Sequence, residues 1–140
     1  KTADLDLSLA LLLHDTGKPL ASSVEGNRFN NHAQIGTRAA SDFMKRLGFS
    51  SSTIEKVCYL VKNHMLPAAV KTLPSFRSEP VMSSPHFPLL LEVFRCDLLS
   101  TFRGPEPYYE ACKVYKTYLK NTKNPFRSSD GKKLLRQYVN

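Results

Sequence analysis

An apolar run that stops at a charged turn, LLLHDTGKP at residues 11–19, is the most informative segment of this 140-residue chain. The Thr-Gly-Lys-Pro sequence at residues 16–19 breaks any regular element that precedes it. His14 and Asp15 therefore stand at the end of an apolar element, where adjacent side chains can still reach one ion. Histidine nitrogens and carboxylate oxygens are good ligands for divalent transition metals. The pair is a candidate metal site, although a single His-Asp dipeptide is a weak signal.

The segments on either side of this turn favour helices. Residues 5–13 alternate in a way that would suit a strand, but a buried helix is equally allowed because apolar residues also fill the gaps. Gly48 is a natural residue just after a helix, and Ser52 with Glu55 predicts a capping box. Residues 22–29 read as a small hairpin or loop, and residues 66–88, rich in Pro and Ser, as a long loop. The predicted class is all-α, with helices over residues 31–47, 52–66, 89–101, 105–120 and 129–139.

Composition and charge narrow the classes of function. No apolar run approaches the ~18 residues of a membrane-spanning helix, and three cysteines without CxxC spacing argue against a disulfide scaffold and a structural zinc site. A reducing, cytoplasmic compartment fits best. The net charge is +8, and residues 1–110 hold 12 Lys and Arg against 11 Asp and Glu, so the excess lies in the last 30 residues. This asymmetry indicates a polyanion partner, with a solvated helical face as the alternative.

Three polar residues fall on the apolar faces of predicted helices, namely His32, His64 and Asp97. A buried carboxylate without a partner costs several kcal/mol, so Asp97 needs a cation, a metal or hydrogen-bond donors. A single inward histidine is more often a satisfied core residue than a ligand, and Asp97 alone would suit a salt bridge equally well. The joint occurrence of these residues with His14 and Asp15 is what indicates a metal site. His86 is interpreted as a surface residue.

These motifs together resemble the HD superfamily of metal-dependent phosphohydrolases, and most closely the HD domain of bacterial tRNA nucleotidyltransferases and poly(A) polymerases. The resemblance is carried by LLLHDTGKP at residues 11–19, NHAQIG at 31–36, RLGFS at 46–50, VKNHM at 61–65 and RCD at 95–97. It runs from about Leu9 to Tyr118 with its spacing kept.

The resemblance implies an all-helical HD bundle with a metal cleft. His14, Asp15 and Asp97 would bind a first divalent ion, and His32 and His64 would extend the site to a second ion or to a substrate phosphate. Lys18 would face the scissile phosphate, although it also suits a solvated turn. The implied chemistry is hydrolysis of phosphoesters such as 2′,3′-cyclic phosphates or 2′-phosphates, with Asp15 holding the metal and orienting the attacking water. The ion could be Mg, Mn, Ni, Co, Fe or Zn.

The family pattern also has a histidine on a helix upstream of the His-Asp pair, and none precedes His14 here. We therefore expect residues 1–110 to be an HD core whose upstream helix is missing, with residues 111–140 as a basic helical extension. No Gly-Ser motif followed by Asp-x-Asp occurs, so the nucleotide-adding reaction is expected in an N-terminal nucleotidyltransferase domain of the parent chain.

The basic extension suggests RNA as a partner, because Lys and Arg bind phosphates with release of counterions. Tyrosines interleave with the lysines, and we favour core positions for Tyr108 and Tyr115. The alternative function is a non-catalytic HD body that binds tRNA or supports the fold, and a free-standing nucleotide phosphohydrolase is a third, weaker reading. The predicted nucleic-acid-binding residues are Lys113, Lys116, Lys120, Lys132, Lys133 and Arg136.

Overall fold

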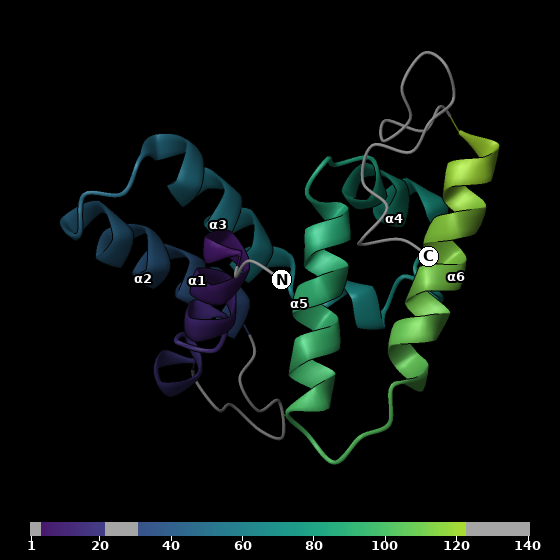
Figure 1. Ribbon diagram of the computed structural model, residues 1–140, viewed down its shortest axis with the longest axis horizontal. Coiled ribbons are helices and arrows are strands. Elements are labelled where there is room, and N and C mark those ends of the chain that lie inside the picture. Colours follow the sequence, from purple (N-terminus) through teal and green to yellow (C-terminus); the bar gives the residue numbers. More distant parts are fainter. Residues whose placement is uncertain (1–3, 22–30, 123–140) are drawn as a thin grey trace. The chain divides into compact units, whose positions relative to one another are not determined.

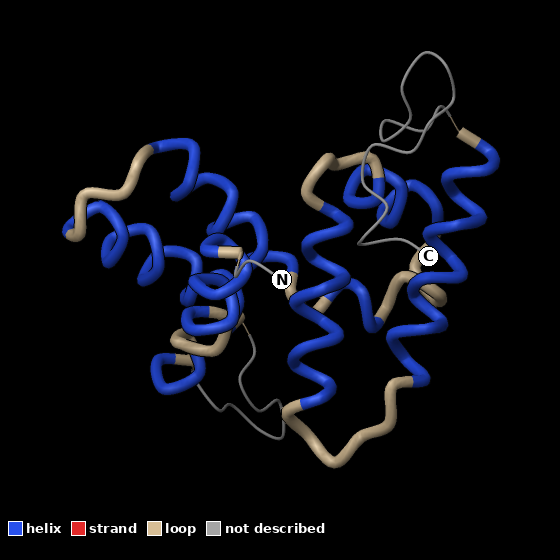
Figure 2. The backbone as a smooth tube through the Cα atoms, viewed as in Figure 1, coloured by secondary structure: helices blue, strands red, loops and turns tan. Residues whose placement is uncertain are grey.

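The computed structural model describes residues 4–21 and 31–122, and helices are the only regular secondary structure within these ranges (Figures 1 and 2). The predicted all-α class is confirmed. The predicted hairpin or loop at residues 22–29 and the predicted helix at 129–139 lie outside the described residues, as do Lys132, Lys133 and Arg136. No helix in the described ranges has the length and apolar character needed to cross a bilayer.

The chain divides into two compact units, residues 1–65 and 66–140. Helix α6 (Glu106–Asn121) starts inside the predicted core, residues 1–110, and ends inside the predicted extension, residues 111–140. It therefore crosses the predicted boundary between them. The first unit contains α1 (Leu5–Leu13), the short 3-10 helix η1 (Lys18–Leu20), α2 (His32–Arg46) and α3 (Ser51–Asn63). The second contains the 3-10 helix η2 (Leu66–Ala68), α4 (Ser75–Met82), α5 (Phe87–Leu99) and α6 (Glu106–Asn121).

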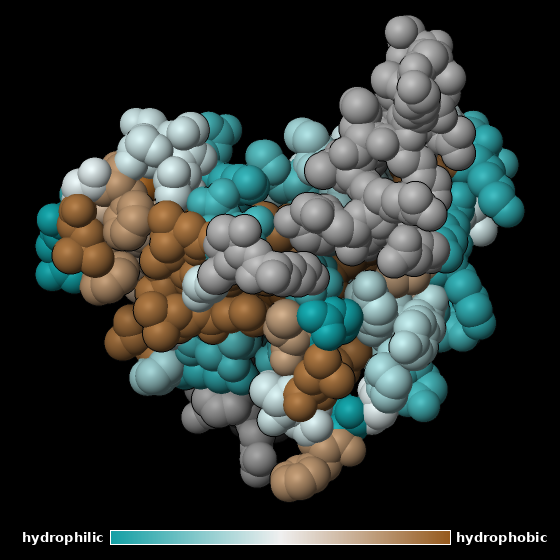
Figure 3. Space-filling model, viewed as in Figure 1, coloured by the Kyte–Doolittle hydropathy of each residue, from teal (hydrophilic) through white to brown (hydrophobic). Residues whose placement is uncertain are grey.

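The segment that suited a strand or a helix equally well is the helix α1. Asp4 caps it, because its carboxylate accepts a hydrogen bond from the backbone N–H of Leu7 at 3.0 Å. One face of α1 is buried in the first unit, while Leu5 and Leu12 are 59% and 68% exposed. Figure 3 shows this side of the unit as a brown apolar surface. The helix is thus apolar on both faces, which explains why its sequence lacks a helical period.

Helix α3 packs against both α1 and α2 around a core of Met44, Val57, Leu60 and Val61. The turn between α2 and α3 has Gly48 at a φ of +76°, a left-handed conformation that glycine adopts at little cost. The predicted role of Gly48 is therefore confirmed.

Two details of this pair were predicted wrongly. The cap of α3 is Ser50 rather than Ser52, since the Ser50 backbone is extended and its hydroxyl accepts from the N–H of Thr53 at 3.3 Å. The helical spacing also predicts Leu47 and Met65 on the inward faces of these two helices, but they are 60% and 55% exposed. Both follow the last residue of their helix, where the periodicity that would turn them inward no longer applies.

The predicted long loop at residues 66–88 is wrong, because it contains η2 and α4. Pro74 stands at the N-cap of α4, where a missing N–H costs nothing. Pro80 lies inside this eight-residue helix, and the serines read as loop signals sit at its start and end. In α5 the helical spacing predicts an inward face of Leu90, Val93, Phe94 and Leu98, and all four residues are buried. Tyr115 of α6 is fully buried with its ring 4.7 Å from that of Phe87, as predicted for a core residue, whereas Tyr108 is only partly buried.

A candidate metal centre in the first unit

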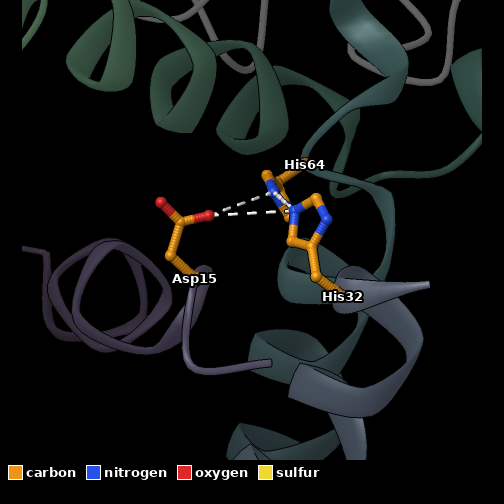
Figure 4. A group of neighbouring side chains, drawn as sticks. All are labelled: Asp15, His32 and His64. Atoms are coloured by element: carbon orange, nitrogen blue, oxygen red, sulfur yellow. Dashed lines mark hydrogen bonds and ion pairs between the residues drawn. The ribbon is translucent and has the colours of Figure 1, made fainter. Parts of the chain in front are cut away.

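Four predicted site residues of the first unit meet around the carboxylate of Asp15. Asp15 and His14 follow the last turn of α1, His32 is the first residue of α2, and His64 caps the C-terminus of α3. Three helix ends therefore bring these side chains together from segments far apart in the sequence. Figure 4 shows Asp15 and His32 pointing toward each other and toward His64.

The two oxygens of Asp15 face different partners. Oδ1 lies 3.8 Å from Nε2 of His32 and 3.8 Å from Nε2 of His64. Oδ2 lies 2.6 Å from Nζ of Lys18 and 3.3 Å from Nε2 of His14. The two histidine nitrogens are themselves 3.1 Å apart. Each of the other four side chains thus lies within 3.8 Å of an Asp15 oxygen. The Asp15 side chain is 39% exposed to solvent.

Backbone carbonyls orient two of the rings. Nδ1 of His14 is 2.7 Å from the carbonyl oxygen of Leu11, and Nδ1 of His64 is 2.6 Å from that of Val61. A carbonyl only accepts, so each Nδ1 carries the proton and donates it. In the neutral ring Nε2 is then left with a lone pair, which is the form that binds a metal. Both Nε2 atoms lie on the Asp15 side of their rings, as the distances above show.

The electrostatics of the cluster favour an ionised Asp15 and a neutral His64. Burial raises the pKa of Asp15, but the hydrogen bond from Lys18 and the neighbouring His14 outweigh it, so this pKa lies below its ordinary value. Burial also lowers the pKa of His64, and repulsion from His14 and His32 lowers it further. A carboxylate beside neutral imidazoles is the protonation state that metal coordination requires.

The close packing of two glycines holds the turn after α1 against the start of α2. A Cβ added at Gly17 would lie 1.9 Å from the carbonyl oxygen of His32 and 2.6 Å from the backbone N of Gly36. Its φ of −78° is ordinary for any residue, so space alone demands glycine there. This backbone contact places the turn that holds Asp15 and Lys18 beside the first turn of α2, which begins with His32.

The donor atoms fit a divalent ion. Asp15, His32 and His64 each offer one ligand atom, and these three atoms lie within 4.8 Å of one another. Two nitrogens about 2.1 Å from one ion lie roughly 3.0–3.4 Å apart at ordinary coordination angles, and the Nε2 atoms are 3.1 Å apart. The Asp15 oxygen, at 3.8 Å from each, would need to approach by less than about 1 Å. Three helix ends thus present a candidate metal-binding triad.

The remaining predicted residues lie in the second unit. Asp97 is on α5 and is partly rather than fully buried, and its role as a ligand stays a prediction. The buried carboxylate of α5 is instead Glu92, which accepts a hydrogen bond from Nε of Arg95 at 3.0 Å. This hydrogen bond raises the pKa of Arg95 above its ordinary value. His86, predicted at the surface, is the partly buried N-cap of α5.

The residues that position the candidate ligands were not predicted from the sequence. Gly17 and Gly36, together with the carbonyls of Leu11 and Val61, fix where the ligands stand, yet none is itself a ligand. A signal for the glycines was present: one follows the His-Asp pair by two residues and the other follows His32 by four. Spacing of this kind at a helix start favours close backbone approach.

Comparison with known proteins places this geometry in a family. The family model for the HD domain matches residues 2–101. A CC-adding tRNA nucleotidyltransferase from Thermus thermophilus is 34% identical over 131 residues, covering 88% of this chain and 28% of the relative. An A-adding tRNA nucleotidyltransferase from Deinococcus radiodurans is 38% identical over 72 residues, 47% of this chain and 17% of the relative.

A third relative has a different printed activity. A bifunctional uridylyltransferase/uridylyl-removing enzyme from Phenylobacterium zucineum is 43% identical over 60 residues, which is 43% of this chain and 6% of the relative. No solved structure matches the chain. The chain spans little more than a quarter of the length of the Thermus relative. The family match over residues 2–101 includes Asp15, the four residues around its carboxylate (His14, Lys18, His32 and His64) and Asp97. This chain belongs to the HD domain family.

Proposed function

We propose that the first unit carries a divalent-metal-dependent phosphohydrolase centre, in a protein of the tRNA nucleotidyltransferase type. The observation that carries the proposal is the convergence of the Asp15 carboxylate with Nε2 of His32 and of His64, with the His64 tautomer set by a backbone carbonyl. Nitrogen and oxygen donors of this kind suit a transition-metal ion.

In this proposal the ion would be held by Asp15, His32 and His64, with His14 as a further ligand. When bound, the ion lowers the pKa of a water ligand and neutralises phosphate oxygens. Asp15 would help to hold the ion and would orient the attacking water. Lys18, whose side chain is 39% exposed and whose ammonium lies beside Oδ2 of Asp15, supplies a positive charge to the scissile phosphate. His64 is only 5% exposed, and its lowered pKa favours the neutral ring, whose Nε2 lone pair would bind the ion.

The proposed substrates are phosphoesters such as 2′,3′-cyclic phosphates or 2′-phosphates at RNA ends. Two relatives are named as tRNA nucleotidyltransferases, which supports an RNA-linked substrate and an adjoining nucleotidyltransferase domain. A third is named as uridylyl-removing, and removal of a uridylyl group breaks a phosphoester bond.

The test combines metal content with hydrolysis. The purified chain is analysed for bound metal, then assayed on adenosine 2′,3′-cyclic phosphate and bis(p-nitrophenyl) phosphate with Mn, Ni, Co, Zn or Mg. Asp15→Asn should lose both metal and activity, while Asp42→Asn, the same change at an exposed position of α2, should keep both. A chain that binds no metal and hydrolyses neither ester with any of these ions would overturn the proposal.

The second candidate is a non-catalytic HD body that binds RNA. The observation in its favour is the exposure of Lys113, Lys116 and Lys120 on α6. RNA binding that persists in chelator and falls steeply with salt, in a chain without hydrolytic activity, would select this function.

A further inference from the structure

The outer face of α6 carries an aligned set of cations that ends in an aromatic ring. Tyr109, Lys113, Lys116 and Lys120 are spaced by four, three and four residues, so they lie within about 60° of one another around a helix of ~3.6 residues per turn. All four are exposed, and Tyr109 is 57% exposed. We call this set the α6 stripe. Figure 3 shows hydrophilic surface along the outer edge where α6 lies.

The stripe lies away from the middle of the buried face of its helix. Ala111 and Tyr115 face the core of the second unit, about 170° and 130° from the middle of the stripe on a helical wheel, while the buried Cys112 is about 70° from it, on the side of Lys116. None of the lysines is therefore needed for packing, and their ammonium groups project into solvent.

Glu110, the acid that pairs with Lys113 of the stripe, also pairs with a lysine outside the stripe. Oε2 of Glu110 lies 3.0 Å from Nζ of Lys71, and its Oε1 lies 3.3 Å from Nζ of Lys113. The hydrogen bond from Lys71, followed by that from Lys113, lowers the pKa of Glu110. Lys71 thus shares the negative charge of Glu110 with Lys113. Exposed ion pairs of this kind are weak, so a phosphate can replace Glu110 as the partner of Lys113.

Tyr109 presents its ring where a base could stack. Its neighbour Tyr108 is partly buried, and the two ring centroids are 5.6 Å apart at an angle of 57°. Burial, followed by a hydrogen bond with Cys112, raises the pKa of Tyr108. Core packing explains Tyr115 but does not explain an exposed ring at the end of a row of lysines.

We propose that the α6 stripe binds single-stranded RNA, with Tyr109 stacking on an unpaired base and the three lysines contacting successive phosphates. A basic groove or face with an aromatic platform is the usual means of holding unpaired nucleic acid. Double-stranded RNA is the less suitable ligand, because its bases are already stacked and Tyr109 would have no partner. Residues 123–140, which follow α6, add five Lys and Arg against Asp130 alone, so the same chemistry continues along the chain.

This site is the RNA-binding part of the proposed function, and it does not depend on the metal centre. Its test is therefore carried out in EDTA. Fluorescence anisotropy measures binding of the full chain to a labelled 12-nucleotide single-stranded RNA and to a hairpin RNA with a paired stem, over a series of salt concentrations. Without metal the assay reports the stripe and not the hydrolase, and Asp42→Asn, at an exposed position outside both sites, should leave both affinities unchanged.

Two sets of variants probe the stripe. Changing Lys113, Lys116 and Lys120 together to Ala should weaken single-strand binding and reduce the slope of log K against log salt by about 2, since each phosphate contact contributes about 0.7 for single strands. The matched control changes Lys62, Arg77 and Arg103 to Ala, three exposed cations outside the stripe, and should leave the slope nearly unchanged.

Tyr109→Ala should weaken single-strand binding about 5- to 100-fold, as expected for loss of one stacked base, with a smaller effect on the hairpin. Tyr109→Phe should restore it, because the ring and not the hydroxyl stacks. The proposal is wrong if the stripe and control triple variants behave alike, or if Tyr109→Ala binds like the parent. It is also wrong if the stripe variants affect only binding to phosphatidylserine vesicles and not to RNA.

Discussion

Replacing Gly17 by alanine should disrupt the metal centre without touching a ligand. The added Cβ would lie 1.9 Å from the His32 carbonyl oxygen, and real Cβ atoms do not approach closer than 3.0 Å, so the turn and the start of α2 must separate by about 1.1 Å. The obstacle is backbone, which has no rotamer to yield. Since the φ of Gly17 is ordinary, the effect comes from space alone.

The displacement is large on the scale of the site. Ligand constellations need to be held within about 0.5 Å of their working geometry, and the turn carries Asp15 while α2 carries His32. A shift of about 1 Å between them would widen the 3.8 Å approach of Asp15 Oδ1 to His32 Nε2. We expect metal affinity to fall at least tenfold, and overpacking to lower the free energy of unfolding by about 3 kcal/mol.

Gly36→Ala is the matched control. Its Cβ would lie 3.3 Å from the backbone N of Gly17, which requires an adjustment of only a few tenths of an ångström. The gain in helix propensity from Gly to Ala, about 0.5–1 kcal/mol, offsets much of that cost. Affinity for Mn²⁺ is measured by calorimetry and stability by urea unfolding. Equal affinity for Gly17→Ala and the parent, or a larger loss for Gly36→Ala, would refute the reasoning.

Three further predictions concern metal, pH and capping. Mn²⁺ should raise the unfolding temperature of the parent, and this increase should vanish in Asp15→Asn; an equal increase in both proteins would contradict the site. Because the folded-state pKa of His64 is lowered, the unfolded chain binds its proton first as pH falls below about 6.5, so unfolding free energy should decrease with acidification below that pH, and less so in His64→Gln. Asp15 adds a second loss at lower pH, since a depressed carboxyl pKa stabilises the fold only until pH falls through the folded pKa. Ser50→Ala should cost about 1 kcal/mol in urea unfolding and Ser52→Ala almost nothing, because Ser50 is the residue whose hydroxyl accepts from the N–H of Thr53; equal losses would mean that the cap is misassigned.

The candidate ligands His32 and His64 could be picked out from the sequence because polar residues are rare on apolar helix faces. His32 and His64 stood out against the helical period around them, and the structure places both beside Asp15. What the period cannot give is the order of contacts. The resemblance implied that His14 and Asp15 share one ion while His32 and His64 extend the site, whereas the triad that the described residues form is Asp15 with His32 and His64. That grouping depends on the Gly17 contact, which is a tertiary feature.

The errors in the predicted fold come from residue types that favour more than one local structure. Proline marks a loop interior and equally a helix start, and Pro74 and Pro88 both stand at helix starts. Three successive serines at residues 50–52 are each good caps, and only the extended backbone at Ser50 decides among them. In α1, leucines on both faces removed the period that identifies a helix elsewhere.

The two proposed activities rest on different parts of the chain, and each has its own physical requirement. The proposed hydrolysis requires Asp15 to hold a cation between neutral imidazoles. The residues of this metal centre lie between positions 14 and 64. RNA binding by the α6 stripe requires exposed charge and one exposed ring, between positions 109 and 120. A chelator acts on the first requirement and salt on the second, because a coordinated ion is held by directed ligands while phosphate contacts are screened. If the protein cleaves RNA-borne phosphoesters, salt should raise the KM for RNA substrates far more than for adenosine 2′,3′-cyclic phosphate, which has only one phosphate to offer the stripe.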